Sequence, residues 1–121
     1  MIVGTGTDIQ DLAPIERALA RNDQFLKRVL TPQEQAQAHQ LHGQRLVEYV
    51  GGRWATKEAF SKAWGTGIGK QVGFQDIEVL NNAQGKPEVT RSPHPGPVWV
   101  SISHTKALAL SFVILERSEN A

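Results

Sequence analysis

The chain has 121 residues, of which 40% are hydrophobic and 21% are charged, and its formal net charge at pH 7 is +1. This length suits one domain spanning residues 1–121, and the balance is typical of a globular chain rather than a disordered one. The small net charge argues against a general nucleic-acid binder. There is no cysteine, which excludes a disulfide scaffold, a thiolate zinc site and a cysteine nucleophile. No signal peptide or membrane-length apolar run is visible, so we expect a cytoplasmic protein with no membrane partner.

Residues 2–9 are expected to form a first strand, because apolar and β-branched residues recur along them. Gly4 and Gly6 suggest the close approach of other backbone or of a ligand. Asp8 closes the strand and Asp11 follows three residues later. Either carboxylate could cap the next helix, which the residues alone favour, or Asp8 could be a metal ligand held rigidly at a strand end.

Residues 14–28 are predicted to be helical, with a break at Asn22 and Asp23 as the alternative. If the helix is continuous, three arginines fall within a narrow arc of its surface. These are Arg17, Arg21 and Arg28. The arc is either a solvated basic face or a landing surface for an acidic partner, and Phe25 beside it is either core or an apolar anchor.

A second helix is predicted to begin after Thr31, which has capping-box spacing with Glu34, and Pro32 suits the first helical position. Its polar composition predicts a short, exposed helix. His39 and His42 could in principle ligate a metal, but no third ligand lies nearby in the sequence, so surface histidines are favoured.

Residues 44–64 are predicted to form a long helix with a broad apolar surface at the centre of the domain. Gly51 and Gly52 should each cost about 1 kcal/mol there relative to alanine. Either they allow close packing against another backbone, or the helix breaks at them.

The second half of this helix carries the charged residues of most interest. Glu58 and Lys62 lie four apart on one side, Lys57 is adjacent, and a glycine cluster at 65–69 can end the helix with a left-handed cap. The group is either an ordinary salt bridge on a solvated helix or a place to hold a metal ion and a phosphate. The stretch alone favours the salt bridge.

The rest of the chain predicts strands at residues 74–80, 86–90, 98–103 and 107–116. Pro87 marks the second of these as an edge strand, and the nearly continuous apolar run of the last marks it as central. An early strand, several helices and then an antiparallel meander predict an α+β fold.

Five short motifs, taken together, resemble the motif series of the 4′-phosphopantetheinyl transferases. They are Gly6-Thr7-Asp8-Ile9, the W-x-x-K-E-A-x-x-K stretch from Trp54 to Lys62, Gly65-Thr66-Gly67, Gly85-Lys86-Pro87 and Ser101-Ile102-Ser103-His104-Thr105. Their order covers essentially the whole chain, and the small size is similar to the holo-acyl-carrier-protein synthase branch. Because of this resemblance, we expect functional rather than purely structural roles for Asp8, Glu58, Lys62 and His104.

The resemblance implies a fold in which an antiparallel sheet packs against a long central helix. It implies transfer of the 4′-phosphopantetheine arm of coenzyme A to a serine of acyl carrier protein in fatty acid biosynthesis, with Mg²⁺ as cofactor and adenosine 3′,5′-bisphosphate as the second product. Asp8 and Glu58 match the metal-binding carboxylates, and Lys62 matches the lysine near the phosphates. Other matches for coenzyme A are Arg45, Arg53, Gly65, Gly67 and His104. The base is either Glu58 or a metal-bound water.

The resemblance also implies a homotrimer with coenzyme A at the subunit boundary and a basic surface for the carrier protein. That surface would comprise Arg17, Arg21, Phe25 and Arg28. One departure is Pro14, where relatives often carry arginine. The rival interpretations are a non-catalytic coenzyme A or nucleotide-binding trimer of this fold, and a larger transferase built of two fused half-domains, which the chain length disfavours.

Overall fold

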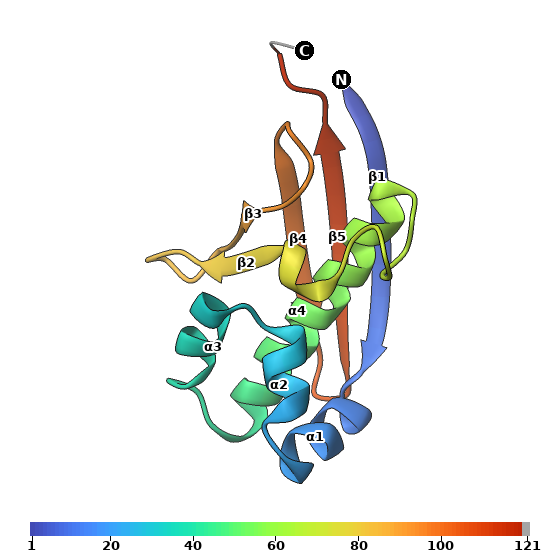
Figure 1. The fold of residues 1–121 in the computed structure, drawn as a ribbon. Helices are drawn as coiled ribbons and strands as arrows, with labels where there is room; N and C mark the ends of the chain where they lie inside the picture. The colour runs from blue at the N-terminus through green and yellow to red at the C-terminus, as the bar shows by residue number, and fades with distance from the viewer. Residues whose placement is uncertain (120–121) are drawn as a thin grey trace.

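A three-stranded antiparallel sheet and one long helix form the centre of the computed structural model, which describes residues 1–119 (Figure 1). The elements in chain order are β1 (Ile2–Asp11), α1 (Leu12–Arg21), α2 (Gln24–Val29), α3 (Pro32–Ala38), α4 (Gly43–Trp64), the 3₁₀ turn η1 (Phe74–Asp76), β2 (Glu78–Asn81), β3 (Pro87–Arg91), β4 (Val98–His104) and β5 (Leu108–Glu116). The predicted α+β class is confirmed. Within residues 1–119, no helix is long and apolar enough to cross a membrane.

The sheet has the order β1-β5-β4, so the last strand is central, as its apolar sequence predicted. The predicted meander is wrong, because β2 and β3 form a separate two-stranded sheet. Three prolines in the segment 92–97 come between β3 and β4, and proline cannot donate to a strand ladder. The strand predicted at 74–80 is also shorter, because the Asp76 carboxylate accepts the Gly73 N–H at 2.8 Å and closes a turn there.

Helix α4 crosses one face of the sheet diagonally (Figure 1). A Cβ added to Gly6 would collide with the Ala59 carbonyl oxygen, and one added to Gly4 would collide with that of Ala63. The two glycines therefore allow β1 to lie directly against the backbone of α4, which confirms the close approach predicted from the sequence.

The paired glycines in α4 do not break the helix, which runs unbroken from Gly43 to Trp64. A Cβ on Gly51 would collide with the Leu12 side chain, and one on Gly52 would press against Ile102. The helix break is thus wrong, and the close packing is real but is against side chains rather than against another backbone. Gly65 then ends the helix in the left-handed conformation, with φ 100°.

The predicted helix at 14–28 takes the broken alternative, because Asn22 is extended and separates α1 from α2. The capping box of Thr31 and Glu34 at the start of α3 is confirmed. However, α3 is not simply an exposed helix, since the Glu34 side chain is fully buried.

The sheet face opposite α4 carries large apolar side chains that are exposed in the single chain. Ile9 on β1 pairs with Leu110 on β5, and Phe112 follows two residues later on the same face. Trp99 on β4 belongs to the same group, with 54% of its surface exposed. Several large apolar side chains gathered on one sheet face are unusual for a monomer and mark an interaction surface.

Candidate active site

Asp8, Glu58 and Lys62 meet where β1 runs along the second half of α4. The Lys62 ammonium donates to Asp8 Oδ1 and to the Thr7 carbonyl oxygen, each at 3.1 Å. The Lys62 side chain is 54% exposed, whereas that of Asp8 is 15% exposed. Glu58 lies one helical turn before Lys62 and is half-buried. Lys62 therefore pairs with the distant Asp8, and the predicted local Glu58–Lys62 salt bridge is not what holds it.

The electrostatics of this group favour a bound cation. Burial raises the pKa of Glu58, the negative charge of Asp8 raises it further, and Lys62 opposes the shift. A cation between the two carboxylates would relieve their repulsion. Helix capping does not account for the aspartates, because Asp8 lies within β1 and the Asp11 side chain makes no cap hydrogen bond.

Two carboxylates suit magnesium rather than an all-protein metal cage. Among residues 1–119 there is no group of three or more His, Cys, Asp and Glu side chains that could hold a metal. Mg²⁺ commonly binds one or two carboxylates and takes its other ligands from water and substrate phosphates. Asp8 and Glu58 therefore fit this ion.

The other predicted cations gather on the far side of α4, around a cavity of about 270 Å³. The lining includes Arg45, Arg53 and His104. His104 Nδ1 lies 3.5 Å from the carboxylate of Glu48, a residue that the sequence analysis missed. Gly85 and Pro87, from the Gly-Lys-Pro motif, also line this cavity.

Arg53 is fixed in place by its neighbours. Its side chain donates to the Val79 carbonyl at 3.0 Å and to Asn81 Oδ1 at 2.7 Å, and its guanidinium lies 3.9 Å from the centre of the Tyr49 ring. Burial lowers the pKa of Arg53 and raises that of the Tyr49 phenol to about 12. The sequence gives no sign of these partners, which come from β2 and from the preceding turn of α4.

Helix α4 itself separates the two groups. The Thr56 hydroxyl of α4 lies 2.8 Å from the Ser111 hydroxyl of the central strand. Ser111 pairs with Asp8 on one side and with Ile102 on the other. Since a helix with its side chains is about 10 Å across, α4 stands between the carboxylates on the β1 side and the basic cavity on the β4 side.

The predicted glycine loop lies beyond the end of α4 and lines a separate cavity of about 340 Å³. The backbone N–H groups of Gly65 and Gly67 both donate to the Ser61 carbonyl oxygen, at 2.9 and 3.2 Å. They are thus engaged in capping the helix. These two N–H groups are therefore not free to donate hydrogen bonds to coenzyme A, and any contact of the glycines with it would rest on close packing.

The basic surface is arranged differently from the predicted arc. Arg17 and Arg21 are exposed on α1, whereas Arg28 is exposed on α2, which is a separate helix. Phe25 is half-buried and stacks on Trp54, with ring centres 5.7 Å apart. The Arg28 guanidinium lies 5.6 Å from the centre of the Phe25 ring. Phe25 is therefore anchored in the core rather than projecting freely.

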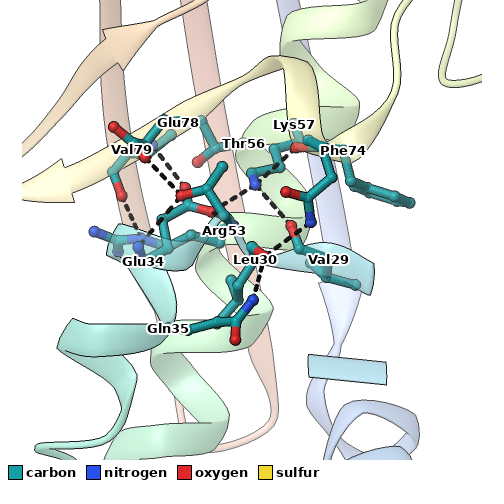
Figure 2. Close-up of polar contacts among 12 residues, drawn as sticks. Val29, Leu30, Glu34, Gln35, Arg53, Thr56, Lys57, Phe74, Glu78 and Val79 are labelled. Carbon is teal, nitrogen blue, oxygen red and sulfur yellow. Dashed lines mark hydrogen bonds and ion pairs between the residues drawn. The ribbon is translucent and has the colours of Figure 1, made fainter. Parts of the chain in front are cut away.

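The expected grouping of Lys57 with Glu58 and Lys62 is wrong, because the Lys57 ammonium does not join the carboxylates near Lys62. Figure 2 shows Lys57 pointing from α4 toward Val29, Phe74 and Glu34 instead. The side chains of Lys57 and Glu34 are fully buried and lie 2.6 Å apart. Burial lowers the pKa of Lys57 from its ordinary value, and the Glu34 carboxylate opposes this shift.

Comparison with known proteins agrees with this geometry. The sequence model of the 4′-phosphopantetheinyl transferase superfamily matches residues 4–113. A holo-[acyl-carrier-protein] synthase of Streptococcus sanguinis is 52% identical over 121 residues, covering 100% of both chains. One of Streptococcus thermophilus is 51% identical over 119 residues, covering 98% of this chain and 99% of the relative.

Solved structures show the same similarity. A holo-(acyl-carrier-protein) synthase from Bacillus anthracis in complex with CoA (3′,5′-ADP) has a TM-score of 0.90 and 51% identity, covering 98% of this chain and 99% of that one. One from Helicobacter pylori in complex with coenzyme A has a TM-score of 0.81 and 31% identity, covering 93% and 99%. The predicted resemblance is confirmed: the chain belongs to the 4′-phosphopantetheinyl transferase superfamily.

Proposed function

We propose that this chain transfers 4′-phosphopantetheine from coenzyme A to a serine hydroxyl of apo acyl carrier protein, in fatty acid biosynthesis in the cytoplasm. The full-length relatives at 51–52% identity bear the name of this activity. The structural observation that supports it most strongly is the meeting of Asp8 and Glu58 with Lys62, whose ammonium lies 3.1 Å from Asp8. Residues far apart in the sequence thus lie together where a metal ion and a phosphate would be held.

In the proposed reaction, the serine oxygen attacks the phosphorus that carries the pantetheine arm. The bond from that phosphorus to the bridging oxygen breaks, and adenosine 3′,5′-bisphosphate leaves with the bonding electrons. Asp8 and Glu58 would hold Mg²⁺, which neutralises charge on the pyrophosphate when it is bound. The exposed Lys62 ammonium would stabilise the leaving phosphate. The serine proton goes to Glu58 or to a water molecule held beside it.

Arg45, Arg53 and His104 would bind the phosphates of the nucleotide half. All three line the cavity of about 270 Å³ on the β4 side of α4. The named ligands of the Bacillus anthracis and Helicobacter pylori structures, coenzyme A and its nucleotide portion, support this role for a basic cavity. Arg53 is rigid because Val79, Asn81 and Tyr49 hold it, which suits binding of a fixed anion.

We further propose a homotrimer whose active site lies between subunits. The carboxylates and the basic cavity lie on opposite sides of α4, so one copy can supply the metal group and its neighbour the nucleotide cavity. The exposed apolar sheet face, which includes Ile9, Leu110 and Phe112, gives a surface for the contact.

A mixing experiment tests the shared site. Chains carrying Asp8→Asn and chains carrying Arg45→Ala should each be nearly inactive alone. Trimers assembled from an equal mixture should recover up to about a quarter of the parent activity, because a quarter of their interfaces would combine two intact halves. Activity no higher than the sum of the separate variants would show that each site lies within one chain.

The exposed arginines of α1 and α2 would bind the acidic surface of the carrier protein. Changing Arg21 and Arg28 to glutamate should raise the apparent KM for carrier protein far more than that for coenzyme A, because neither residue lies near the nucleotide cavity. Arg17 would contribute from one turn beyond Pro14. Equal changes in both KM values would contradict this docking surface.

The deciding experiment is mass spectrometry of apo acyl carrier protein incubated with this chain, coenzyme A and Mg²⁺. A mass gain of one phosphopantetheine arm, lost with a chelator and in Glu58→Gln, is the expected result. A folded sample that binds coenzyme A but modifies none of several carrier proteins would favour the non-catalytic interpretation. A mass gain that persists in Glu58→Gln would support the transferase activity but contradict the proposed metal site.

A further inference from the structure

Lys57 joins three separate segments to α4 through one buried ammonium group (Figure 2). It donates to Glu34 Oε1 on α3 at 2.6 Å. It also donates to the carbonyl oxygens of Val29, at the end of α2, and Phe74, in η1, at 2.7 and 2.9 Å. An ammonium has three N–H donors, so all of them are used inside the protein.

Glu34 is held as firmly as Lys57. Its Oε1 also accepts the Thr31 N–H at 2.8 Å, and its Oε2 accepts the Val79 N–H at 2.7 Å. The Thr31 hydroxyl donates in turn to Glu78 at 2.7 Å. Among the residues that the structure describes, no buried side-chain nitrogen or oxygen lacks a partner. The ion pair therefore has a single, fully specified geometry.

Stability alone is a poor explanation for charges at this position. The cost of removing two charges from water can equal or exceed their attraction, and a well-packed apolar pair is often as stable. Buried apolar residues adjoin the pair, since Val29, whose carbonyl accepts from Lys57, and Leu30 beside it are fully buried. Hydrogen bonds to fixed acceptors add direction, which an apolar pair lacks, because the angle at the donor hydrogen prefers values above about 150°.

The orientation of α4 about its own axis decides where Glu58 lies. Successive helical residues are about 100° apart, so with Thr56 facing the sheet, Lys57 projects to one flank of α4 and Glu58, about 200° from Thr56, projects away from the sheet beyond the other flank. Where α4 lies against Gly4 and Gly6 of β1, the residues that it presents are Ala59 and Ala63. Small residues allow close approach but provide few interlocking ridges that resist rotation. Arg53 and Thr56 also tie α4 to other elements, but the Lys57 contacts are the hydrogen bonds made by the residue next to Glu58, so they resist rotation at the carboxylate itself.

We propose that Lys57, held by Glu34, is a positioning residue that fixes the rotation of α4 and so sets Glu58 against Asp8. This inference rests on the proposed function, because it takes Asp8 and Glu58 as the metal ligands. A binding constellation tolerates rotations of only about 10–20°, so loss of this contact should weaken metal binding directly.

Manganese binding tests the proposal without requiring turnover. Mn²⁺ is titrated by electron paramagnetic resonance into the full chain with coenzyme A and without carrier protein, at a temperature where circular dichroism shows a folded sample. Lys57→Met should raise the Kd for Mn²⁺ about tenfold or more, which is typical when a supporting contact to a metal ligand is lost.

Gln75→Ala is the matched control. The Gln75 amide donates to the carbonyl oxygens of Lys27, Arg28 and Leu30, so it joins η1 to the end of α2, and none of these hydrogen bonds involves α4. Its Kd for Mn²⁺ should stay within about twofold of the parent value. Glu34→Gln is the second variant, since it keeps the shape of the side chain while removing the charge, and it should weaken Mn²⁺ binding in the same direction.

The outcomes separate this proposal from the function on which it rests. A folded Lys57→Met or Glu34→Gln chain that binds Mn²⁺ within about twofold of the parent would overturn the positioning role. A Gln75→Ala chain that loses as much affinity would do the same, since general loosening would then be the cause. A parent chain that binds no Mn²⁺ would instead overturn the metal site itself.

Discussion

Two lysines on one helix, Lys57 and Lys62, each pair with a carboxylate that is distant in the sequence, yet their surroundings are opposite. The Lys57 side chain is 0% exposed and lies 2.6 Å from Glu34. The Lys62 side chain is 54% exposed and lies 3.1 Å from Asp8. The same pair of chemical groups therefore occurs once in the interior and once at the surface.

The difference shows what each ammonium has left to offer. All donors of Lys57 are directed at protein oxygens, so it can only hold structure. Lys62 contacts Asp8 and the Thr7 carbonyl but stays open to solvent, where a phosphate can approach it. Position on the helix, rather than residue type, separates the structural lysine from the proposed functional one.

The largest expected effect is on stability. Lys57→Met should lower the free energy of unfolding by about 3–5 kcal/mol, because it leaves Glu34 charged and unpaired in the interior. Lys62→Met should lower it by less than about 1 kcal/mol, since an exposed pair contributes little. Urea denaturation of both variants measures the two losses. Equal losses would remove the distinction between the pairs.

The second effect is on catalysis, where Lys62→Met should have a large effect although it costs little stability. Lys62→Met should lower kcat about 100-fold, equivalent to about 2.7 kcal/mol of transition-state stabilisation, because a donor at the leaving phosphate is lost. Steady-state transfer of the pantetheine arm to carrier protein gives kcat directly. A stable variant with unchanged kcat would place Lys62 outside the reaction.

A smaller effect concerns salt. The coupling free energy between Lys62 and Asp8, from a double-mutant cycle with methionine and asparagine, should be below about 1 kcal/mol and disappear near 1 M salt. The corresponding cycle for Lys57 and Glu34 should change by less than about 0.5 kcal/mol, because buried charges are poorly screened. If both couplings fell together on adding salt, the interior pair would be reached by solvent.

The smallest effect is a pH dependence at Glu58, whose pKa is raised mainly by burial. The folded state holds this proton more tightly than the unfolded chain does. The resulting stability is present below the ordinary pKa and is lost as the pH rises through the raised one. The metal-free parent should therefore lose stability relative to Glu58→Gln as the pH rises above the ordinary glutamate pKa of about 4.3, as measured by urea midpoints. A parent that gained stability relative to Glu58→Gln over this range would contradict the raised pKa.

The sequence predicted the elements whose signals are local. The capping box of Thr31 and Glu34 and the central last strand were expected, whereas the family resemblance predicted Asp8, Glu58 and Lys62 in one site but not the pairing of Lys62 with Asp8. The late start of the strand predicted at 74–80, which begins only at Glu78, was missed, although Gly73 and Asp76 carry a turn signal.

The burial of Lys57 could not be predicted in this way. Its partner Glu34 lies 23 residues away and on a helix whose composition indicates exposure. Lysine and glutamate are almost never fully buried unless they are paired, and a pairing between helices leaves no periodic trace in the sequence. The same holds for the separation of Asp8 from Arg45, which depends on where α4 crosses the sheet.

The division of the proposed site by α4 has a consequence for inheritance. In a trimer with shared sites, each chain contributes to two active sites. A chain that lacks only the carboxylates inactivates one of them, whereas a chain that also lacks the basic cavity inactivates both. In a cell that makes two versions of the protein, the doubly defective version would therefore be the more dominant. Two versions with different single defects would complement each other.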